Sequence, residues 1–187
     1  MTDDVLAGVR DDAADRARIV ELLIVERANF VTQYEAIPPE QRTARPASGG
    51  WSAAEVAQHV SRVESGVAKM VLAGPTRPQA SATEAAAAHL TPKKVQTVRD
   101  RTEKVQAPER VHPTDASDAS AVRVQLDESR AALLAAFEAA DEAVLDGVTF
   151  PHPFIGPLTL RAWVELVAHH DARHAVQVQE LAPHLRR

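Results

Sequence analysis

The chain contains no cysteine, few aromatic residues and no long apolar run. Without cysteine it has no disulfide, thiolate metal site or cysteine nucleophile, so any thiol chemistry needs an external small-molecule thiol. Aromatic residues make up 4% of the 187 residues, which disfavours sheets, because strands favour β-branched and aromatic side chains. No stretch reaches ~18 apolar residues, so we expect no membrane span.

Positive charge is also in short supply. There are 21 Lys and Arg residues against 26 Asp and Glu, and the net charge is -5. This balance argues against general nucleic-acid binding, which needs a basic surface. The acidic start, Met1-Thr2-Asp3-Asp4, is followed by no long apolar segment, so we expect no secretory signal. The composition favours a cytoplasmic protein.

Alanine-rich stretches with helical periodicity are abundant, and they predict four long amphipathic helices. The four run over about Asp11 to Glu35, Ser52 to Gly74, Ala119 to Leu145 and Thr159 to Ala182. Ser52 and Glu55 have the spacing of a capping box, and Thr159 is a candidate cap. In the first helix, Glu26 is the one polar interruption of the apolar stripe. No strand is predicted, and residues 150–157 are expected to form a stiff loop.

These helices predict an all-α fold, a four-helix bundle forming a single domain over residues 1–187. A proline-rich insertion separates the second and third long helices, and residues 75–119 hold five of the twelve prolines. Thr91-Pro92 could open a short helix through Lys104, since proline suits the first helical position. The basic residues of this stretch alternate with Asp100 and Glu103, which favours a solvated helix face over a nucleic-acid contact.

Three of the eight histidines are placed so that they could share one ligand. His170 and His174 are four residues apart, so they project from one face of a helix. His59 lies between Val56 and Val63 on the apolar stripe of another helix. All three therefore face the bundle interior, where bundles build metal sites. A lone inward histidine is usually a hydrogen-bonded core residue, but three on two helices favour a metal site.

Three imidazoles with an open fourth position are typical of catalytic zinc sites, whereas structural sites are closed by four protein ligands. Imidazole also suits Ni²⁺ and Fe²⁺. Glu55 lies one turn before His59 and could reach the metal, but its capping role explains it better. Asp171 and Gln177 are candidates to bond the ligating imidazoles, with a solvent-facing position as the alternative. Because the ligands must be neutral, metal release is expected toward pH 5.

The remaining histidines are expected outside the metal site. His169 is rotated by ~100° from its neighbour and should lie on the helix flank. The others are expected in loops or near the chain end, at the surface: His89, His112, His152 and His184. Of these, His112 and His152 could also line an entrance. No general base is predicted from the sequence.

Three motifs of the chain belong together: Trp51-Ser52-x-x-Glu55-Val56-x-x-His59-Val60, Gly156-Pro157-Leu158-Thr159 and His170-Asp171-x-Arg173-His174-x-x-Gln177. In this order they resemble the DinB-like superfamily of damage-inducible proteins. The resemblance spans about Arg16 to Leu181 and is weakest over the insertion. It implies a four-helix bundle, a divalent metal on His59, His170 and His174, and a homodimer. Its members include mycothiol-dependent maleylpyruvate isomerase and bacillithiol transferases.

Together these features predict a divalent-metal-dependent enzyme acting on a small molecule, by thiol (S-)transfer or a related hydrolase reaction. The open position would hold water or a low-molecular-weight thiol cosubstrate. One alternative is a non-catalytic metal-binding stress-response protein of the same family. A second is a helical dimerisation module with a histidine-containing core.

Overall fold

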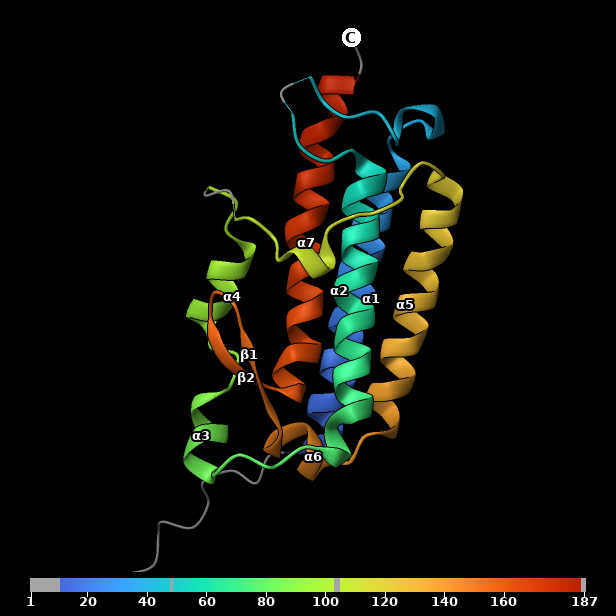
Figure 1. Ribbon diagram of the computed structural model, residues 1–187. Coiled ribbons are helices and arrows are strands. Elements are labelled where there is room, and N and C mark those ends of the chain that lie inside the picture. The colour runs from blue at the N-terminus through green and yellow to red at the C-terminus, as the bar shows by residue number, and fades with distance from the viewer. Residues whose placement is uncertain (1–10, 48, 103–104, 186–187) are drawn as a thin grey trace, which may run out of the picture.

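Four long helices form the body of the protein (Figure 1). The computed structural model describes residues 11–47, 49–102 and 105–185. The long helices are α1 (Asp12–Glu35), α2 (Ala53–Ala73), α5 (Ala119–Ala139) and α7 (Leu160–Leu185). They form a four-helix bundle, which confirms the predicted fold. No helix within the described part of the chain is long and apolar enough to span a bilayer.

The order of the helices explains the long insertion. In Figure 1, α1 and α7 run upward whereas α2 and α5 both run downward. The closest packing joins α1 to α7 and α2 to α5, and α2 also contacts α7. Because α2 and α5 are parallel, no short loop can join them, and the chain must return along the length of the bundle. Residues 74–118 supply this crossover, and the short η1 (Pro39–Gln41) lies in the α1–α2 connection.

The crossover contains more helix than the sequence predicted. Its elements are η2 (Gly74–Thr76), α3 (Ala82–Ala87), α4 (Pro92–Arg99) and η3 (Glu109–Val111). Thr91 caps α4 as expected, since its hydroxyl accepts from the Lys94 amide at 3.3 Å. The helix ends at Arg99, before the predicted end at Lys104, which lies outside the described residues. The chain then crosses in front of α7 and α2 to reach α5 (Figure 1).

The third long helix is shorter than predicted. It ends at Ala139, and α6 (Glu142–Gly147) follows as a separate helix. Ala140 adopts an extended conformation (ψ 139°), so the chain turns there. Arg16 of α1 donates to the carbonyls of Phe137 and Ala140. A side chain from another helix therefore satisfies acceptors that a continuous helix would have used itself.

A small hairpin replaces the loop predicted over residues 150–157, so the expectation of no strand was wrong. Strands β1 (Thr149–His152) and β2 (Gly156–Thr159) pair antiparallel, with Phe150 opposite Leu158. Gly156 has φ 78°, a left-handed conformation that glycine tolerates best. The strands form a two-stranded sheet without further neighbours among the described residues, and prolines are tolerated in such edge strands.

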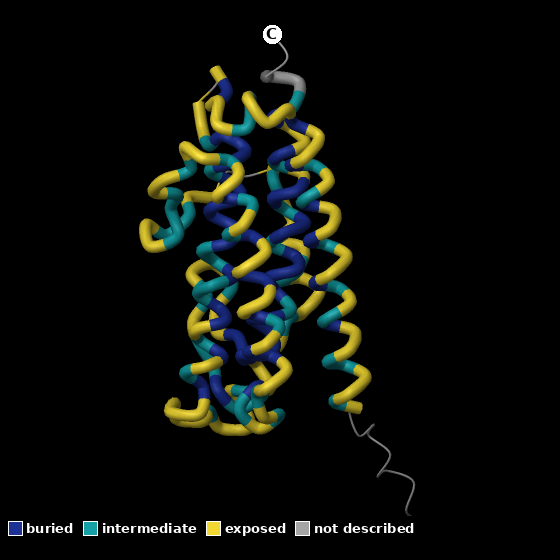
Figure 2. The backbone as a smooth tube through the Cα atoms, turned by 90° about the vertical axis from the view of Figure 1, so that its right-hand side faces the viewer, coloured by how far each residue is buried: buried dark blue, intermediate teal, exposed yellow. Residues whose placement is uncertain are grey.

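The core runs along the inward faces of the four long helices, as the buried segments in Figure 2 show. At its centre lies an ionic network with one residue from each long helix: Arg27, Glu64, Arg130 and Asp171. Arg27 bonds Glu64 at 2.6 Å and Asp171 at 2.9 Å, and Arg130 bonds the same two carboxylates at 2.6 and 2.8 Å. Glu64 and Asp171 have no exposed surface.

The ionic network corrects two expectations about which polar residues face inward. Arg27, not Glu26, interrupts the buried face of α1, whereas Glu26 pairs with Arg99 of α4. Asp171 neither bonds a histidine nor faces solvent, because both of its arginine partners lie in the core. Buried charges are tolerated only when they are paired, so the network holds all four helices in one register.

Candidate metal centre

Helix α2 carries His59 and α7 carries His170 and His174. The predicted capping box starts α2: Ser52 accepts from the Glu55 amide at 3.2 Å, and Glu55 accepts from the Ser52 amide at 2.8 Å. Thr159 caps α7 by accepting from the Ala162 amide at 3.2 Å. With both helix starts fixed and α2 packed on α7, the three histidines meet inside the bundle, as predicted.

The three imidazoles converge through their Nε2 atoms. His170 Nε2 lies 3.2 Å from His59 Nε2 and 3.1 Å from His174 Nε2, and the candidate ligand atoms of all three residues lie within 4.8 Å of one another. Three nitrogens bound to one tetrahedral ion at about 2.0–2.1 Å would be roughly 3.3 Å apart. The spacing therefore fits a single metal ion.

Hydrogen bonds at the far side of two rings fix their tautomers. His59 Nδ1 donates to the Val111 carbonyl at 2.9 Å, and His174 Nδ1 donates to Gln177 Oε1 at 2.7 Å. Each ring therefore carries its proton on Nδ1 and directs the Nε2 lone pair at the shared point. A neutral His170 has one N–H and can satisfy only one of these lone pairs, whereas a cation satisfies all three rings.

Electrostatics keep the three rings neutral. Burial lowers the pKa of His59 from 6.5 to about 4. Burial also lowers the pKa values of His170 and His174 well below their usual range, and the neighbouring histidines lower them further. Neutral imidazole is the form that binds metal, so the cluster is in its ligating form at neutral pH.

Two polar residues near the cluster have different roles: Gln177 positions a histidine, and Glu55 caps α2. Gln177 holds His174, as expected for a partner of a ligating imidazole. Its amide oxygen also accepts from Arg101 at 3.4 Å, which fixes the amide orientation. Glu55 is occupied by its cap and by an ion pair with Arg45, which confirms the capping interpretation.

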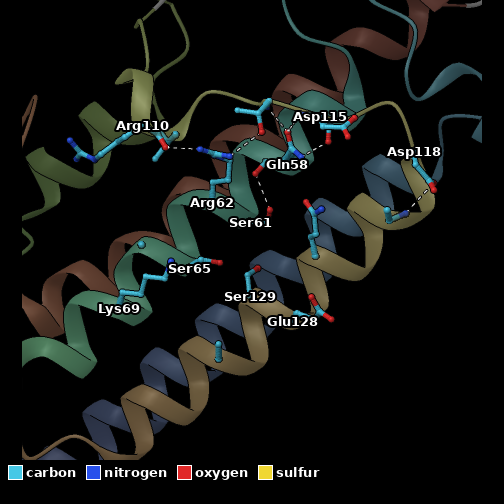
Figure 3. A pocket seen from close by; sticks show the side chains of 16 residues that line it. Gln58, Ser61, Arg62, Ser65, Lys69, Arg110, Asp115, Asp118, Glu128 and Ser129 are labelled. Carbon is cyan, nitrogen blue, oxygen red and sulfur yellow. Dashed lines mark hydrogen bonds between the residues drawn. The ribbon is translucent and has the colours of Figure 1, made fainter.

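The crossover reaches the histidine cluster through contacts that no sequence motif indicates. Gln58, next to His59, accepts from the amides of Thr114 and Asp115 at 2.8 and 3.1 Å. These bonds, drawn in Figure 3, fasten the crossover against α2. The Val111 carbonyl is thereby held over His59. No pattern in the sequence pairs Gln58 with residues more than 50 positions away.

A cavity of about 680 Å³ adjoins the three histidines. This volume lies in the range of small-molecule sites. Trp51 and Trp163 line it, and the Trp51 ring lies 5.0 Å from the His59 ring. His112 and His152 line the same cavity, in agreement with the prediction that they could line an entrance to the metal site.

The other histidines do not join the cluster. His169 lies on the flank of α7, where its Nδ1 accepts from Arg99 at 3.0 Å. His89 is exposed, and the side chain of His184 falls outside the described residues. A second group of possible ligands, Asp12, Glu142 and Asp146, is balanced by arginines, since Arg161 bonds both Glu142 and Asp146.

A second cavity, of about 880 Å³, lies between α2 and α5 (Figure 3). The two helices line it with opposite charges: Arg62 and Lys69 lie on α2, and Glu128 lies on α5. None of the described histidines lines it. The α2–α5 cavity therefore lacks the candidate metal ligands that line the other cavity.

Comparison with known proteins gives consistent matches. The sequence profile described as the DinB superfamily matches residues 22–178. The chain is 26% identical over 156 residues to the uncharacterized protein YuaE of Bacillus subtilis (strain 168), covering 83% of this chain and 91% of YuaE. The crystal structure of TT2238, a four-helix bundle protein, has a TM-score of 0.56 at 22% identity and covers 88% of this chain and 98% of TT2238.

A further structure, YfiT from Bacillus subtilis, has a TM-score of 0.60 at 16% identity and covers 95% of this chain and 90% of YfiT. YfiT is described as a probable metal-dependent hydrolase with an unusual four-helix bundle topology. At these identities the two structures establish a shared fold.

Proposed function

Because the chain belongs to the DinB superfamily, we propose that it is a divalent-metal-dependent enzyme acting on a small molecule. His59, His170 and His174 hold the metal. The observation that carries this proposal is the convergence of three neutral imidazoles, in which His170 Nε2 lies 3.2 Å from His59 Nε2 and 3.1 Å from His174 Nε2. Hydrogen bonds fix the tautomers of two of the rings. A core histidine needs one partner, whereas this arrangement leaves lone pairs that only a cation satisfies.

The cluster has the features of an open site. Among the described residues no carboxylate joins the three histidines as a fourth ligand, and the chain has no cysteine. The cavity lies directly against the rings. A three-ligand site with room beside it is typical of catalytic metal centres, whereas a structural site is closed.

A divalent ion held by His59, His170 and His174 would supply Lewis-acid activation of a water or thiol. The chain supplies the rest. Val111 and Gln177 orient His59 and His174, and the Trp51 ring packs beside His59 with their centroids 5.0 Å apart. The ionic network beside His170 holds α7 against the other helices.

We propose thiol transfer as the specific reaction. A related hydrolase reaction is the alternative. YfiT, which shares the fold, is described as a probable metal-dependent hydrolase, and hydrolysis needs no further cosubstrate. Thiol transfer needs an external thiol, because the chain has none. The cavity of about 680 Å³ has room for a small substrate beside a low-molecular-weight thiol.

A Co²⁺-substituted sample tests the proposal, with a panel of low-molecular-weight thiols as probes. We expect a visible spectrum that depends on His59 and that gains a sulfur-to-metal band on thiol addition. Substrate turnover should then require both metal and thiol. A spectrum that ignores every thiol, with turnover by water alone, would leave the hydrolase reaction. Metal binding without turnover of any substrate would favour the non-catalytic alternative.

A further inference from the structure

The mouth of the metal cavity carries polar groups that the metal site does not use. The crossover and the β1–β2 hairpin both contribute to it, and Arg110 of η3 and His152 of β1 line the cavity. Burial lowers the pKa of His152, and the positive charge of Arg110 lowers it further. Both side chains offer hydrogen-bond donors.

The Arg110 guanidinium makes no hydrogen bond or ion pair with another described residue. Only its backbone carbonyl is used, as an acceptor from Arg62 at 3.0 Å. Arg110 also lines the edge of the α2–α5 cavity, and in Figure 3 its side chain points away from the middle of that cavity. By contrast, Arg101 on the metal cavity is already paired with Glu180. Arg110 is therefore an uncompensated positive charge at the mouth.

The tautomer of His152 is also fixed. Its Nδ1 accepts from the Phe154 amide at 3.2 Å, so a neutral ring carries its proton on Nε2. The ring is held by Trp163, at 5.0 Å between centroids, and by Phe154, at 5.8 Å. His152 thus presents a neutral N–H donor from a fixed ring.

The remaining wall of the cavity is largely apolar. Both tryptophans of the chain line it, together with Met70, Leu166 and Ile155. Phe154 and Val105 also line it, and they are among the most exposed apolar side chains, at 54% and 49%. Exposed apolar groups around a cavity mark a surface that an apolar ligand covers.

We propose that Arg110 and His152 bind the carboxylate of a small organic acid, whose apolar body fills the cavity toward the three histidines. Among the described residues, the one acidic side chain lining this cavity is Glu180, which Arg101 neutralises. An anion at the mouth therefore meets two donors and no opposing free carboxylate. The inference rests on the proposed function in taking this cavity as the substrate site.

The probe is 4-phenylbutyrate, compared with its neutral amide, 4-phenylbutyramide, and with butyrate, which lacks the apolar body. Binding is measured by calorimetry and by tryptophan fluorescence, which reports on the cavity because both tryptophans line it. A hydrogen bond to a charged group is worth ~1.5 kcal/mol at the weak end, or roughly tenfold in affinity. We expect 4-phenylbutyrate to bind at least about tenfold more tightly than either comparison compound.

Two variants and one matched control locate the effect. Arg110→Gln removes the charge, and His152→Phe removes the donor while keeping a ring against Trp163. Both should reduce the preference for acid over amide and leave the affinity for the amide unchanged. Lys69→Gln removes one positive charge from the other cavity and should change neither value. An equal affinity for acid and amide, or a preference that survives both variants, would overturn the inference, as would no binding by any probe.

Running the titrations with metal-free and metal-loaded protein separates the two proposals. Binding of the acid in both forms, without turnover of any substrate, would retain the anion site and reject the proposed enzyme. Metal-dependent turnover without preference for the acid would support the proposed enzyme and reject the anion site.

Discussion

Replacing Asp171 by Asn should destabilise the bundle far more than its conservative chemistry suggests. Asp171 has no exposed surface, and it accepts from Arg27 at 2.9 Å and from Arg130 at 2.8 Å. The substitution leaves two buried guanidinium groups sharing Glu64 alone. Removing one partner of a buried ion pair costs about 3–5 kcal/mol, and because asparagine still accepts a hydrogen bond we expect about 3 kcal/mol.

Asp127→Asn is the matched control. Asp127 pairs with Arg123 on the surface of α5, and its side chain is 67% exposed. An exposed pair of this kind contributes at most about 1 kcal/mol. The same chemical change should therefore be nearly neutral there, which isolates burial as the cause of the loss at Asp171.

Urea unfolding followed by far-ultraviolet circular dichroism measures both changes, with a chelator present so that metal binding does not contribute. A double variant, Asp171→Asn with Arg130→Met, tests the charge argument. It leaves Arg27 and Glu64 as a balanced pair, so its loss should be smaller than the sum of the single losses by about 1–3 kcal/mol. Additive losses, or an Asp171 variant as stable as the Asp127 variant, would refute the reasoning.

Three further predictions concern the metal centre. The pKa of His59 is about 4 in the folded protein against 6.5, so below pH 6.5 the unfolded chain binds more protons. Stability should therefore fall as pH drops from about 6.5 toward 4, by about 3 kcal/mol from His59 alone, and pH-dependent urea titrations of metal-free protein will show it. Chelation should lower the melting temperature without unfolding the bundle, since a ligand at a thousand times its Kd contributes about 4 kcal/mol; complete unfolding would indicate a structural site. Gln177→Ala should weaken metal affinity about 10–100-fold by freeing the His174 ring, and unchanged affinity in a competition titration would contradict that role.

The sequence predicted the helices and the histidine cluster because both depend on local periodicity. Val56, His59 and Val63 mark one face of α2, and the four-residue spacing of His170 and His174 marks one face of α7. The expected metal release near pH 5 took no account of burial. The lowered pKa of His59 keeps the folded site in its ligating form to lower pH.

Contacts between distant segments could not be predicted in this way. The inward position of Arg27 is stable only because Glu64 and Asp171 meet it from two other helices. The hydrophobicity pattern alone therefore placed Glu26, and not Arg27, on the buried face of α1. Arg110 and His152 line one cavity only because the crossover folds back over the bundle. The hairpin was missed because its strands are four residues each and contain prolines.

The homodimer, the cytoplasmic location and the stress-response role stay predictions of the sequence and its family resemblance. None of them follows from the arrangement of the histidines. Size-exclusion chromatography with light scattering would measure the oligomeric state directly.

Metal content per chain tests the central claim most directly. Protein purified without a histidine tag should contain about one divalent ion per chain by elemental analysis, and the same analysis identifies the metal as zinc, nickel or iron. His59→Ala and His174→Ala should lose most of it, whereas His89→Ala, at an exposed position, should retain it. Equal metal in all three variants, or none in the unmodified protein after metal loading, would contradict the three-histidine site.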